Sequence, residues 1–295
     1  MNLNQLYYFK KLAQLQHFTQ AAKELYITQP TLSGSISTLE EELGIELFHR
    51  EGRNMKLTKY GIKFYTYVCT TLNELEKGIE VIKEESGILT GVIDVGCIPT
   101  LCGDFLPTAI NGYLRTVNSK TKFNIFQGMT LDIVAGIKSN KYDIGFCSFV
   151  ENEPDLEFIP ILTQKLILLV NNNHPLAKEK FLHLEDIHGY SLITYRESLP
   201  IGKIVKKLLK SHDLHANYGF DDEITIGGVV SSTDMAAIAA RTPFLLQFHN
   251  LKPIKLDVQA DARVIYMCYN KNNYHTKSVE MFTDYIIKKE RKLLG

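Results

Sequence analysis

Hydrophobic residues near the start of the chain recur at helical spacing in two short runs. The first run, at 18–25, places its apolar residues on one face of a helix, and the second, at 32–43, does the same. Residues 26–28 interrupt the pattern, and the Thr28 side chain can accept a hydrogen bond as a helix N-cap. Pro30 suits the first turn of a new helix. The pattern predicts a helix-turn-helix whose second helix can enter a major groove.

Small hydroxyl side chains flank the apolar face of the second helix. Serine and threonine can hydrogen-bond to any base, and Gln29 can pair with an adenine edge. A basic cluster with a single acid, Glu51, follows at 49–59 and can supply contacts to phosphates. Amphipathic helices and basic turns each occur alone in proteins that never bind DNA, but together they favour a winged helix-turn-helix. The expected DNA-contacting residues are Thr19, Thr28, Gln29, Thr31, Ser33, Ser35, Ser37, Arg50, Arg53, Lys56 and Lys59.

A longer helix is predicted from the Thr58 cap to about Ser86. Its apolar residues are separated by three and four positions in turn, which is a heptad seam flanked by charges. A seam this short is also what a helix packed on its own domain would show. Because this helix follows a DNA-binding domain, pairing between two copies of it is favoured: it would place two DNA-binding domains at the spacing of two half-sites. The expected dimerisation residues are Tyr65, Val68, Leu72, Leu75, Ile79 and Ile82.

Beyond residues 87–91 the pattern of apolar and polar residues changes, and short apolar runs alternate with stretches of helical spacing. This alternation indicates a parallel sheet with crossover helices. Strands are expected at 92–95, 123–126, 143–147, 166–170, 192–194, 216–220, 244–246 and 263–269, and helices at 103–117, 130–139, 204–212, 225–241 and 277–292.

Specific runs of residues in the first part of the chain match one known family. They are Leu6-Tyr7-Tyr8-Phe9, Phe18-Thr19-Gln20-Ala21-Ala22, Thr28-Gln29-Pro30-Thr31-Leu32-Ser33, Ile36-Ser37-Thr38-Leu39-Glu40, Leu43-Gly44-Ile45-Glu46-Leu47-Phe48-His49-Arg50 and Leu57-Thr58-Lys59-Tyr60-Gly61. Together they resemble the DNA-binding domain of the LysR-type transcriptional regulators. One departure is Gly34-Ser35, where many relatives carry a basic residue, so the operator sequence cannot be inferred from them.

The second part of the chain resembles the same family more weakly. Its matching runs are Gly91-Val92-Ile93-Asp94-Val95-Gly96, Phe105-Leu106-Pro107, Tyr142-Asp143-Ile144-Gly145-Phe146 and His174-Pro175-Leu176-Ala177. The resemblance implies two α/β subdomains like those of periplasmic binding proteins, which enclose an effector cleft and are joined by crossings near 160–163 and 261–266. The segment 226–240 departs from the glycine-rich stretch of many relatives. The implied domains are a winged helix-turn-helix at 1–58, a linker and dimerisation helix at 59–87, effector-binding subdomain I at 91–160 and 266–295, and subdomain II at 163–264.

The loops after the strands are the expected place for an effector, because ligands of open α/β sheets bind beyond the carboxyl ends of strands. Exposed helix N-termini there attract anions, so a small carboxylate or a similarly polar metabolite is expected. Threonines at these positions more commonly serve as N-caps. Arg196 can hold a carboxylate with two parallel hydrogen bonds, although a surface ion pair is its commoner role. The candidate effector-binding residues are Pro99, Thr100, Leu101, Gly128, Thr130, Phe146, Ser148, Tyr195, Arg196 and Thr225.

Composition narrows the class of protein. The 295 residues allow two or three domains, and 33 basic residues balance 33 acidic ones, so basic character is local rather than general. Five cysteines in no ligand-like spacing, with no secretory signal, indicate reduced thiols in the cytoplasm. Cys97 and Cys102 are close enough in sequence for a redox pair, but buried structural cysteines are commoner. No apolar run approaches the roughly 20 residues of a membrane span.

Motifs of the common catalytic classes are missing from the sequence: there is no GxSxG, no GxxxxGK[ST] and no HExxH. The acidic run 40–42 is expected to be a solvated helix face. We therefore expect a transcription regulator that is not an enzyme, with no cofactor or metal, acting as a dimer or tetramer. Its expected partners are operator DNA and a small effector, with RNA polymerase as a further candidate and no membrane.

Two other functions stay open. A solute-binding protein or enzyme with an unrelated helical N-domain would bind ligand without salt-dependent affinity for DNA. An architectural DNA binder would bind DNA in a manner indifferent to metabolites.

Overall fold

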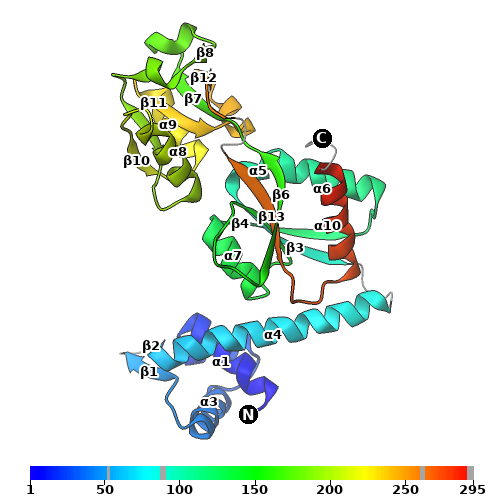
Figure 1. Ribbon diagram of the computed structural model, residues 1–295. Helices are drawn as coiled ribbons and strands as arrows, with labels where there is room; N and C mark the ends of the chain where they lie inside the picture. Colours follow the sequence, from blue (N-terminus) through cyan, green and yellow to red (C-terminus); the bar gives the residue numbers. More distant parts are fainter. Residues whose placement is uncertain (52–53, 87–90, 260–262, 291–295) are drawn as a thin grey trace. The chain divides into compact units, whose positions relative to one another are not determined.

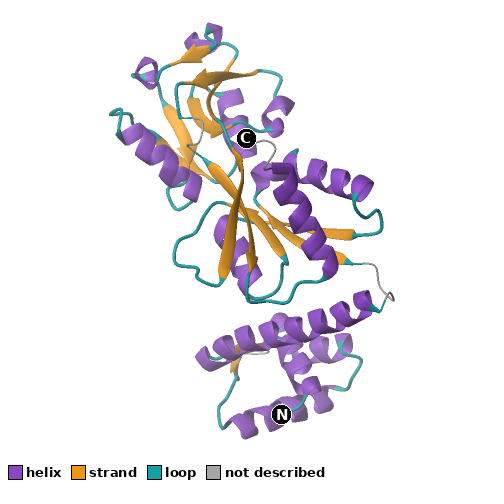
Figure 2. Cartoon of the chain, turned by 45° about the vertical axis from the view of Figure 1, so that its right-hand side comes forward, coloured by secondary structure: helices purple, strands orange, loops and turns teal. Residues whose placement is uncertain are grey.

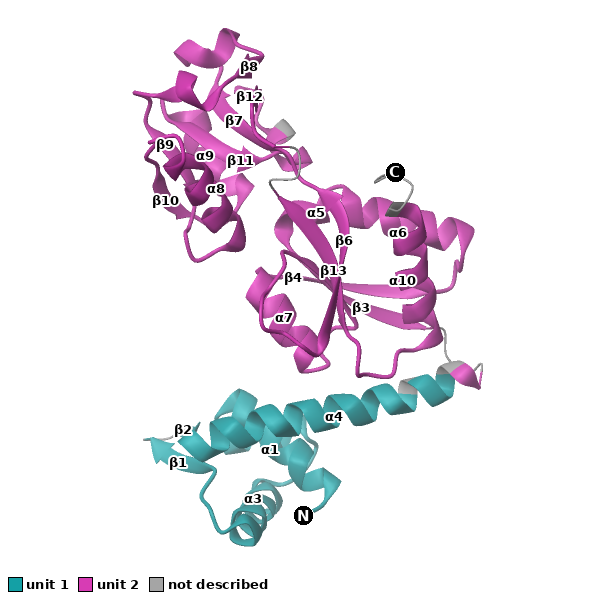
Figure 3. Ribbon diagram, in the orientation of Figure 1, with its two compact units in different colours: residues 1–83 teal, residues 84–295 magenta. Residues whose placement is uncertain are grey.

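The chain falls into two compact units, residues 1–83 and 84–295 (Figure 3). The structure is a computed structural model, and it describes residues 1–51, 54–86, 91–259 and 263–290. Across these ranges, no helix combines the length and the apolar character needed to span a bilayer.

The first unit is the predicted winged helix-turn-helix followed by one long helix. Phe9, Leu12, Leu32 and Leu39 are fully buried at the centre of its core. Its elements are α1 (Leu3–Leu15), α2 (Phe18–Glu24), α3 (Gln29–Leu43), the antiparallel hairpin of β1 (Phe48–Glu51) and β2 (Asn54–Leu57), and α4 (Lys59–Glu85), as Figure 1 shows.

Side-chain caps start α3 and α4 as the sequence predicts. The Thr28 hydroxyl accepts a hydrogen bond from the Thr31 N–H at 3.3 Å and caps α3. The Thr58 hydroxyl accepts one from the Gly61 N–H at 3.0 Å at the start of α4. Gly61 is required by packing, since a Cβ there would lie 2.0 Å from the Leu47 carbonyl oxygen. The hairpin and α4 are therefore held closely together.

The second unit contains two mixed sheets, each flanked by helices (Figure 2). In the first lobe α7 packs on β3 and β5, and α10 packs on β3 and β6. The strand order is β4-β3-β5-β13-β6. The elements of this lobe are β3 (Val92–Cys97), α5 (Pro99–Cys102), α6 (Phe105–Thr116), β4 (Lys122–Gln127), α7 (Thr130–Lys138), β5 (Ile144–Cys147), β6 (Leu156–Thr163), β13 (Val264–Asn270) and α10 (Lys277–Glu290).

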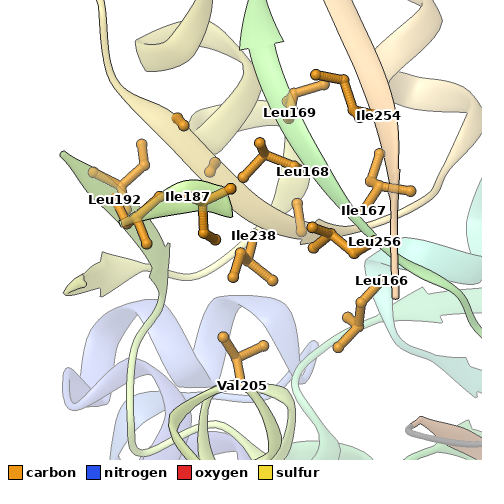
Figure 4. Packing of buried hydrophobic residues seen from close by; sticks show 14 of the residues in the cluster. Leu166, Ile167, Leu168, Leu169, Ile187, Leu192, Val205, Ile238, Ile254 and Leu256 are labelled. Atoms are coloured by element: carbon orange, nitrogen blue, oxygen red, sulfur yellow. The ribbon is translucent and has the colours of Figure 1, made fainter. Parts of the chain in front are cut away.

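The second lobe has the strand order β10-β9-β11-β7-β12-β8. Figure 4 shows its core, where Leu168, Val205 and Ile238 are fully buried. Its elements are β7 (Leu166–Asn171), η1 (Pro175–Lys178), β8 (Phe181–Leu182), η2 (Leu184–Ile187), β9 (Leu192–Tyr195), α8 (Pro200–Lys210), β10 (Asn217–Phe220), α9 (Glu223–Ser232), β11 (Ala236–Ala240), η3 (Pro243–Gln247) and β12 (Leu251–Leu256).

The chain passes between the lobes twice. Residues 160–163, expected at the first crossing, still belong to β6, and the chain crosses at 164–165 before β7 begins. The return segment precedes β13, and part of it, 260–262, lies outside the described residues. The Gln164 N–H donates to the Arg263 carbonyl oxygen at 2.8 Å, which ties the two crossings together.

Two predicted elements are wrong, and the predicted parallel sheet is in fact two mixed sheets. The helix expected at 225–241 ends at Ser232, and 236–240 forms the fully buried strand β11 between β9 and β7. Alanine favours helices, but packing between two strands outweighs that preference. Residues 243–247 form a 3₁₀ helix rather than a strand. The sheets are mixed because β13 runs antiparallel to β5 and β6, and β7 runs antiparallel to β11 and β12.

Candidate functional site

The exposed face of α3 is rich in small polar groups. Leu32, Ile36 and Leu39 are buried on one side, and the opposite side exposes Gly34 and several hydroxyl side chains. A Cβ built on Gly34 would meet no atom within 4 Å, so this face is open at its centre. The exposed hydroxyl residues of α3 are Thr31, Ser37 and Thr38, whereas Ser33 and Ser35 are half-buried at its edges.

Two predicted contact residues are oriented by the turn between α2 and α3. The Thr19 hydroxyl donates to Gln29 Oε1 at 3.3 Å, which joins the two helices at the surface and fixes the Gln29 amide. The Thr28 hydroxyl lies 2.8 Å from that of Thr31 in addition to its capping bond. Thr28 is therefore occupied in holding the helix start, while Gln29 is exposed next to it.

The hairpin presents basic side chains. Arg50 and Lys56 are exposed on β1 and β2, and Lys59 is exposed at the start of α4 with its Nζ 4.8 Å from the centre of the Tyr60 ring. Lys56 forms an ion pair with Glu51 and lowers the pKa of that carboxyl through their hydrogen bond. Exposed pairs of this kind contribute little stability, so Lys56 can exchange its partner for a phosphate. Arg53, also expected here, lies outside the described residues.

Glu40 positions the hairpin, which corrects the expectation that 40–42 is a solvated face. Its Oε1 accepts hydrogen bonds from the backbone N–H groups of Leu47 at 2.7 Å and Phe48 at 3.0 Å. These charge-assisted bonds fix the path from α3 to β1. These hydrogen bonds could not be predicted from residue spacing in the sequence, because the turn after α3 brings the partners together.

The predicted seam of α4 divides into two halves. Val68 and Leu72 are buried in the core of the first unit, and Tyr65 packs against that core. Leu75, Ile79 and Ile82 are 41%, 44% and 68% exposed. The first half of the seam therefore packs on its own domain, and the second half presents an uncovered apolar row.

In the second unit, loops from both lobes line one cleft. Five of the predicted residues line it: Pro99, Thr100, Thr130, Ser148 and Tyr195. The Ser148 N–H donates to the Thr130 hydroxyl at 3.4 Å, so these two loops are linked. The Thr100 hydroxyl is buried and has no hydrogen-bond partner among the described residues. The other lining residues were not among those predicted from the sequence: Ile98, Met129, Leu199, Pro200, Ile201, Asp221, Glu223 and Arg263.

The remaining candidates lie elsewhere. Leu101 and Phe146 belong to the hydrophobic core of the first lobe. Gly128 follows β4 but does not line the cleft, and exposed Thr225 donates to Asp222, which caps α9. Arg196 pairs at the surface with Asp221, with 2.8 Å between Nε and Oδ1.

A buried polar network forms one wall of the cleft. The Tyr195 hydroxyl donates to Glu223 Oε1 at 2.5 Å and accepts from the Ala240 N–H at 2.8 Å. Glu223 is 1% exposed, and burial raises the pKa of its carboxyl. Burial likewise raises the pKa of Tyr195 and lowers the pKa of Arg263. Loops after the carboxyl ends of strands include 221–223, so the rule that suggested the other loops also points to Glu223.

Helix N-termini add positive potential to the cleft. α7 and α8 both begin at its lining residues, and Leu199 gives α8 no side-chain cap. Uncapped N–H groups and the helix dipole favour an anion. Together with the buried side chains of Tyr195, Glu223 and Arg263, these helix starts give the cleft a polar end that suits a small charged ligand.

Two other expectations concern cysteine and metal chemistry. Cys97 and Cys102 both donate to the Ile98 carbonyl oxygen, at 3.4 and 3.5 Å, and are free thiols. The neighbouring Cys102 thiol, and after it burial, raise the pKa of Cys97, whereas the neighbouring Cys97 thiol lowers the pKa of Cys102.

In the described ranges, no three His, Cys, Asp or Glu side chains gather in a way that could hold a metal ion.

Comparison with known proteins accounts for both units. Residues 3–62 match the family model of the bacterial regulatory helix-turn-helix protein, lysR family, and residues 86–291 match that of the LysR substrate binding domain. An uncharacterized HTH-type transcriptional regulator, YybE of Bacillus subtilis (strain 168), is 29% identical over 97% of this chain and 98% of its own length. The transcriptional dual regulator GltC of the same organism is 33% identical over 67% of this chain and 66% of its own length.

Solved structures agree with these matches. The effector binding domain of QuiR in complex with shikimate is 29% identical, covers 69% of this chain and 99% of its own, and has a TM-score of 0.64. The LysR family regulator CbnR, also solved in complex with its target DNA, is 18% identical, covers 98% of this chain and 99% of its own, and has a TM-score of 0.79. The CbnR likeness shows that the fold extends over both units.

Proposed function

The chain belongs to the LysR family of bacterial transcriptional regulators, and we propose that α3 and the hairpin bind an operator while a small carboxylate in the cleft regulates that binding. The protein is thus a DNA-binding regulator with an effector-binding domain. We place its action in the cytoplasm, without catalysis.

The observation that carries the DNA-binding role is the pairing of the α3 face with the basic hairpin in one compact unit. Thr31, Ser37 and Gln29 are exposed on or beside that face and can reach base edges. Arg50 and Lys56 are exposed on the hairpin, where they can neutralise phosphates. Base-reading groups and phosphate-binding groups are both needed for a specific complex.

The cleft supports the effector role. Its polar lining residues come from both lobes and from the crossing between them, so a ligand there contacts both lobes at once. A ligand that binds one arrangement of the lobes more tightly than another shifts the population toward that arrangement. Such a shift can alter the geometry of paired reading heads and hence their fit to DNA.

Self-association is assigned to the second half of α4. Leu75, Ile79 and Ile82 form an apolar row that the described residues of its own chain leave exposed. Pairing of this row between two copies would bury it and hold two DNA-binding units together. Dimers of this kind, or tetramers built from them, would bind two half-sites.

Two substitutions test the assignment on DNA. Ser37→Ala should weaken binding to the specific site more than binding to random DNA, because Ser37 is assigned a base edge. Arg50→Ala should weaken both equally and reduce the dependence of log K on log salt by about one. Equal losses for Ser37→Ala on both DNAs would remove its base-reading role, and an unchanged salt slope would remove Arg50 from the phosphate contacts.

A further inference from the structure

Arg263 occupies a special position in the second unit. It directly precedes β13 at the point where the chain returns to the first lobe, and its carbonyl oxygen is held by the Gln164 N–H of the other crossing. Its side chain is 3% exposed and lines the cleft together with residues of both lobes. A group bound to Arg263 is therefore bound at the joint between the lobes.

Two of the three guanidinium nitrogens of Arg263 have no hydrogen-bond partner within the described ranges. Its Nε and Nη1 are buried and donate to no atom in the described part of the chain. Nor does the structure show an ion pair between Arg263 and Glu223, although their charges attract each other. A buried charge with unsatisfied N–H groups is unfavourable unless an anion or a hydrogen-bond acceptor completes it.

A second buried group that lacks a partner in the described part of the chain lines the same cleft, in α5 of the first lobe. Thr100, from the first lobe, is 8% exposed, and its hydroxyl also has no partner among the described residues. A hydroxyl can donate to an oxyanion, as guanidinium N–H groups do. The same cleft thus holds unsatisfied donors on the return crossing and in α5, the short helix that follows β3.

We infer that Arg263 is the anion anchor of the cleft, and that with Thr100 it binds the carboxylate of the effector. The inference rests on the proposed function, since it names the group that recognises the effector of that same cleft. Arg263 is the specificity-determining residue in this account, because it requires every effector to carry an anionic group.

The surroundings select a compact, singly charged group. The cavity has a volume of about 30 Å³, which is room for little more than one small polar group unless the lobes separate. Asp221 and Glu223 also line it, and Asp221 already has Arg196 as its partner. A carboxylate adds one negative charge beside Arg263, whereas a dianionic phosphate would add a second charge facing these two acids.

The experiment measures binding of sodium salts of acetate, lactate, succinate, benzoate and shikimate to the full-length protein by calorimetry and thermal shift, at constant chloride. Acetamide and benzamide serve as neutral analogues. At least one carboxylate should bind while its neutral analogue does not. Arg263→Met should weaken that binding about ten- to a hundredfold, because a charged hydrogen bond to the ligand is lost.

The control removes the same charge from an exposed position in the first lobe. Arg115→Met should bind the carboxylate within about twofold of the wild type, because Arg115 is exposed and does not line the cleft. Thr100→Val should weaken binding less than Arg263→Met, since it removes a neutral donor.

A readout without ligand separates anchoring from a structural role. If Arg263 is an uncompensated buried charge, Arg263→Met should unfold at a temperature no lower than the wild type. A clear loss of stability would make Arg263 a structural residue and overturn the inference. Arg263→Lys provides a second folded variant that keeps the charge but loses the planar donors.

Binding of every carboxylate with unchanged affinity in Arg263→Met would overturn the inference, and so would failure of all of these carboxylates to bind the wild type. The same preparations are assayed on DNA from upstream of the gene. If the wild type does not bind this DNA specifically, the proposed function is contradicted. If it does bind specifically but Arg263→Met leaves carboxylate affinity unchanged, only the role of Arg263 as the anchor is contradicted.

Discussion

Gly34 is the residue at which stability and DNA binding are expected to conflict. It lies in the middle of α3 on the exposed face, and glycine inside a helix costs stability relative to alanine. Nothing within 4 Å would obstruct a Cβ there. The position therefore keeps a glycine that folding does not require.

We predict that Gly34→Ala stabilises the first unit by about 1 kcal/mol and changes its affinity for the operator. The change in affinity follows because the added methyl projects from the face assigned to the major groove. Denaturant unfolding and operator titration measure the two effects. Gly78→Ala in α4 is the matched control, since its Cβ is also unobstructed: it should raise stability without changing DNA affinity. A destabilised Gly34→Ala would contradict this account of α3.

Glu223 is the residue whose protonation is expected to govern the stability of the second unit. Because burial raises the pKa of Glu223, the folded protein holds a proton that the unfolded chain releases. The stability that this proton contributes is fully present below the unfolded glutamate pKa of about 4.3 and is lost as pH rises to the folded pKa. The groups facing Glu223 are Tyr195, Arg263 and Asp222.

We therefore predict that Glu223→Gln unfolds at a higher temperature than the wild type at pH 7, because glutamine is neutral and still accepts the bond from the Tyr195 hydroxyl. The two proteins should converge in stability below about pH 4.3, where glutamate is protonated in both states. Thermal unfolding across a pH series measures this. A variant less stable than the wild type at pH 7 would show that the ionised carboxylate is needed for folding.

Local signals at single residues could be read from the sequence, and non-local ones could not. The caps at Thr28 and Thr58 involve residues three positions further along the chain, so they could be predicted from the sequence. Thr100, Thr130 and Tyr195 followed from the rule that loops after strands line a cleft. Arg263 was missed because its position beside the cleft depends on the pairing of two crossings far apart in the chain.

At the scale of elements, the hairpin depends on a side chain of α3. Glu40 accepts the N–H groups of Leu47 and Phe48, and both of these residues are buried in the core. Removal of the carboxylate would leave two backbone donors unsatisfied at the start of the hairpin. The basic residues of the hairpin would then lose their fixed position.

We predict that Glu40→Ala lowers the free energy of unfolding of the first unit by about 2 kcal/mol. Glu40→Gln should lose less, since its amide oxygen can still accept. Glu41→Ala serves as the control, because Glu41 is exposed, and it should change stability by no more than about 0.5 kcal/mol. Chemical denaturation measures all three, and equal stability of Glu40→Ala and Glu41→Ala would show that these bonds do not hold the hairpin.

The long helix α4 shows how one pattern can serve two purposes. Its seam was predicted from spacing alone, and spacing cannot say which partner covers each residue. Val68 and Leu72 are covered by α4's own domain, whereas Ile79 is 44% exposed. The hydrophobic repeat was therefore enough to predict the helix and its apolar face. Which half of the seam is buried and which is exposed depends on the packing of the first unit.

We predict that Ile79→Asp weakens self-association at least about tenfold, because burying an unpaired carboxylate against an apolar partner is unfavourable. Tyr67→Asp is the control, since Tyr67 is 74% exposed on α4 but off the seam. Sedimentation velocity over a concentration series measures both variants. A monomeric Tyr67→Asp together with an unchanged Ile79→Asp would place the interface on another face of the helix.

At the scale of the whole molecule, two compact units have different functions. The first unit carries the groups that can contact the base edges and phosphates of DNA, and the second carries a cleft lined by residues of both of its lobes. The sequence predicted this division, because helical spacing in the first unit and alternating strands and helices in the second are strong signals. The mixed sheets and strand β11 were not predictable locally, since strand pairing is decided by packing across the lobe.

The most direct test of the account is binding to the DNA upstream of the protein's own gene and of the adjacent gene, across a salt series, with random DNA alongside. We expect a protected site with two spaced half-sites, bound more tightly than random DNA, and an affinity or footprint that changes when the carboxylate bound by the cleft is added. No preference over random DNA, with and without the carboxylate series, would contradict it.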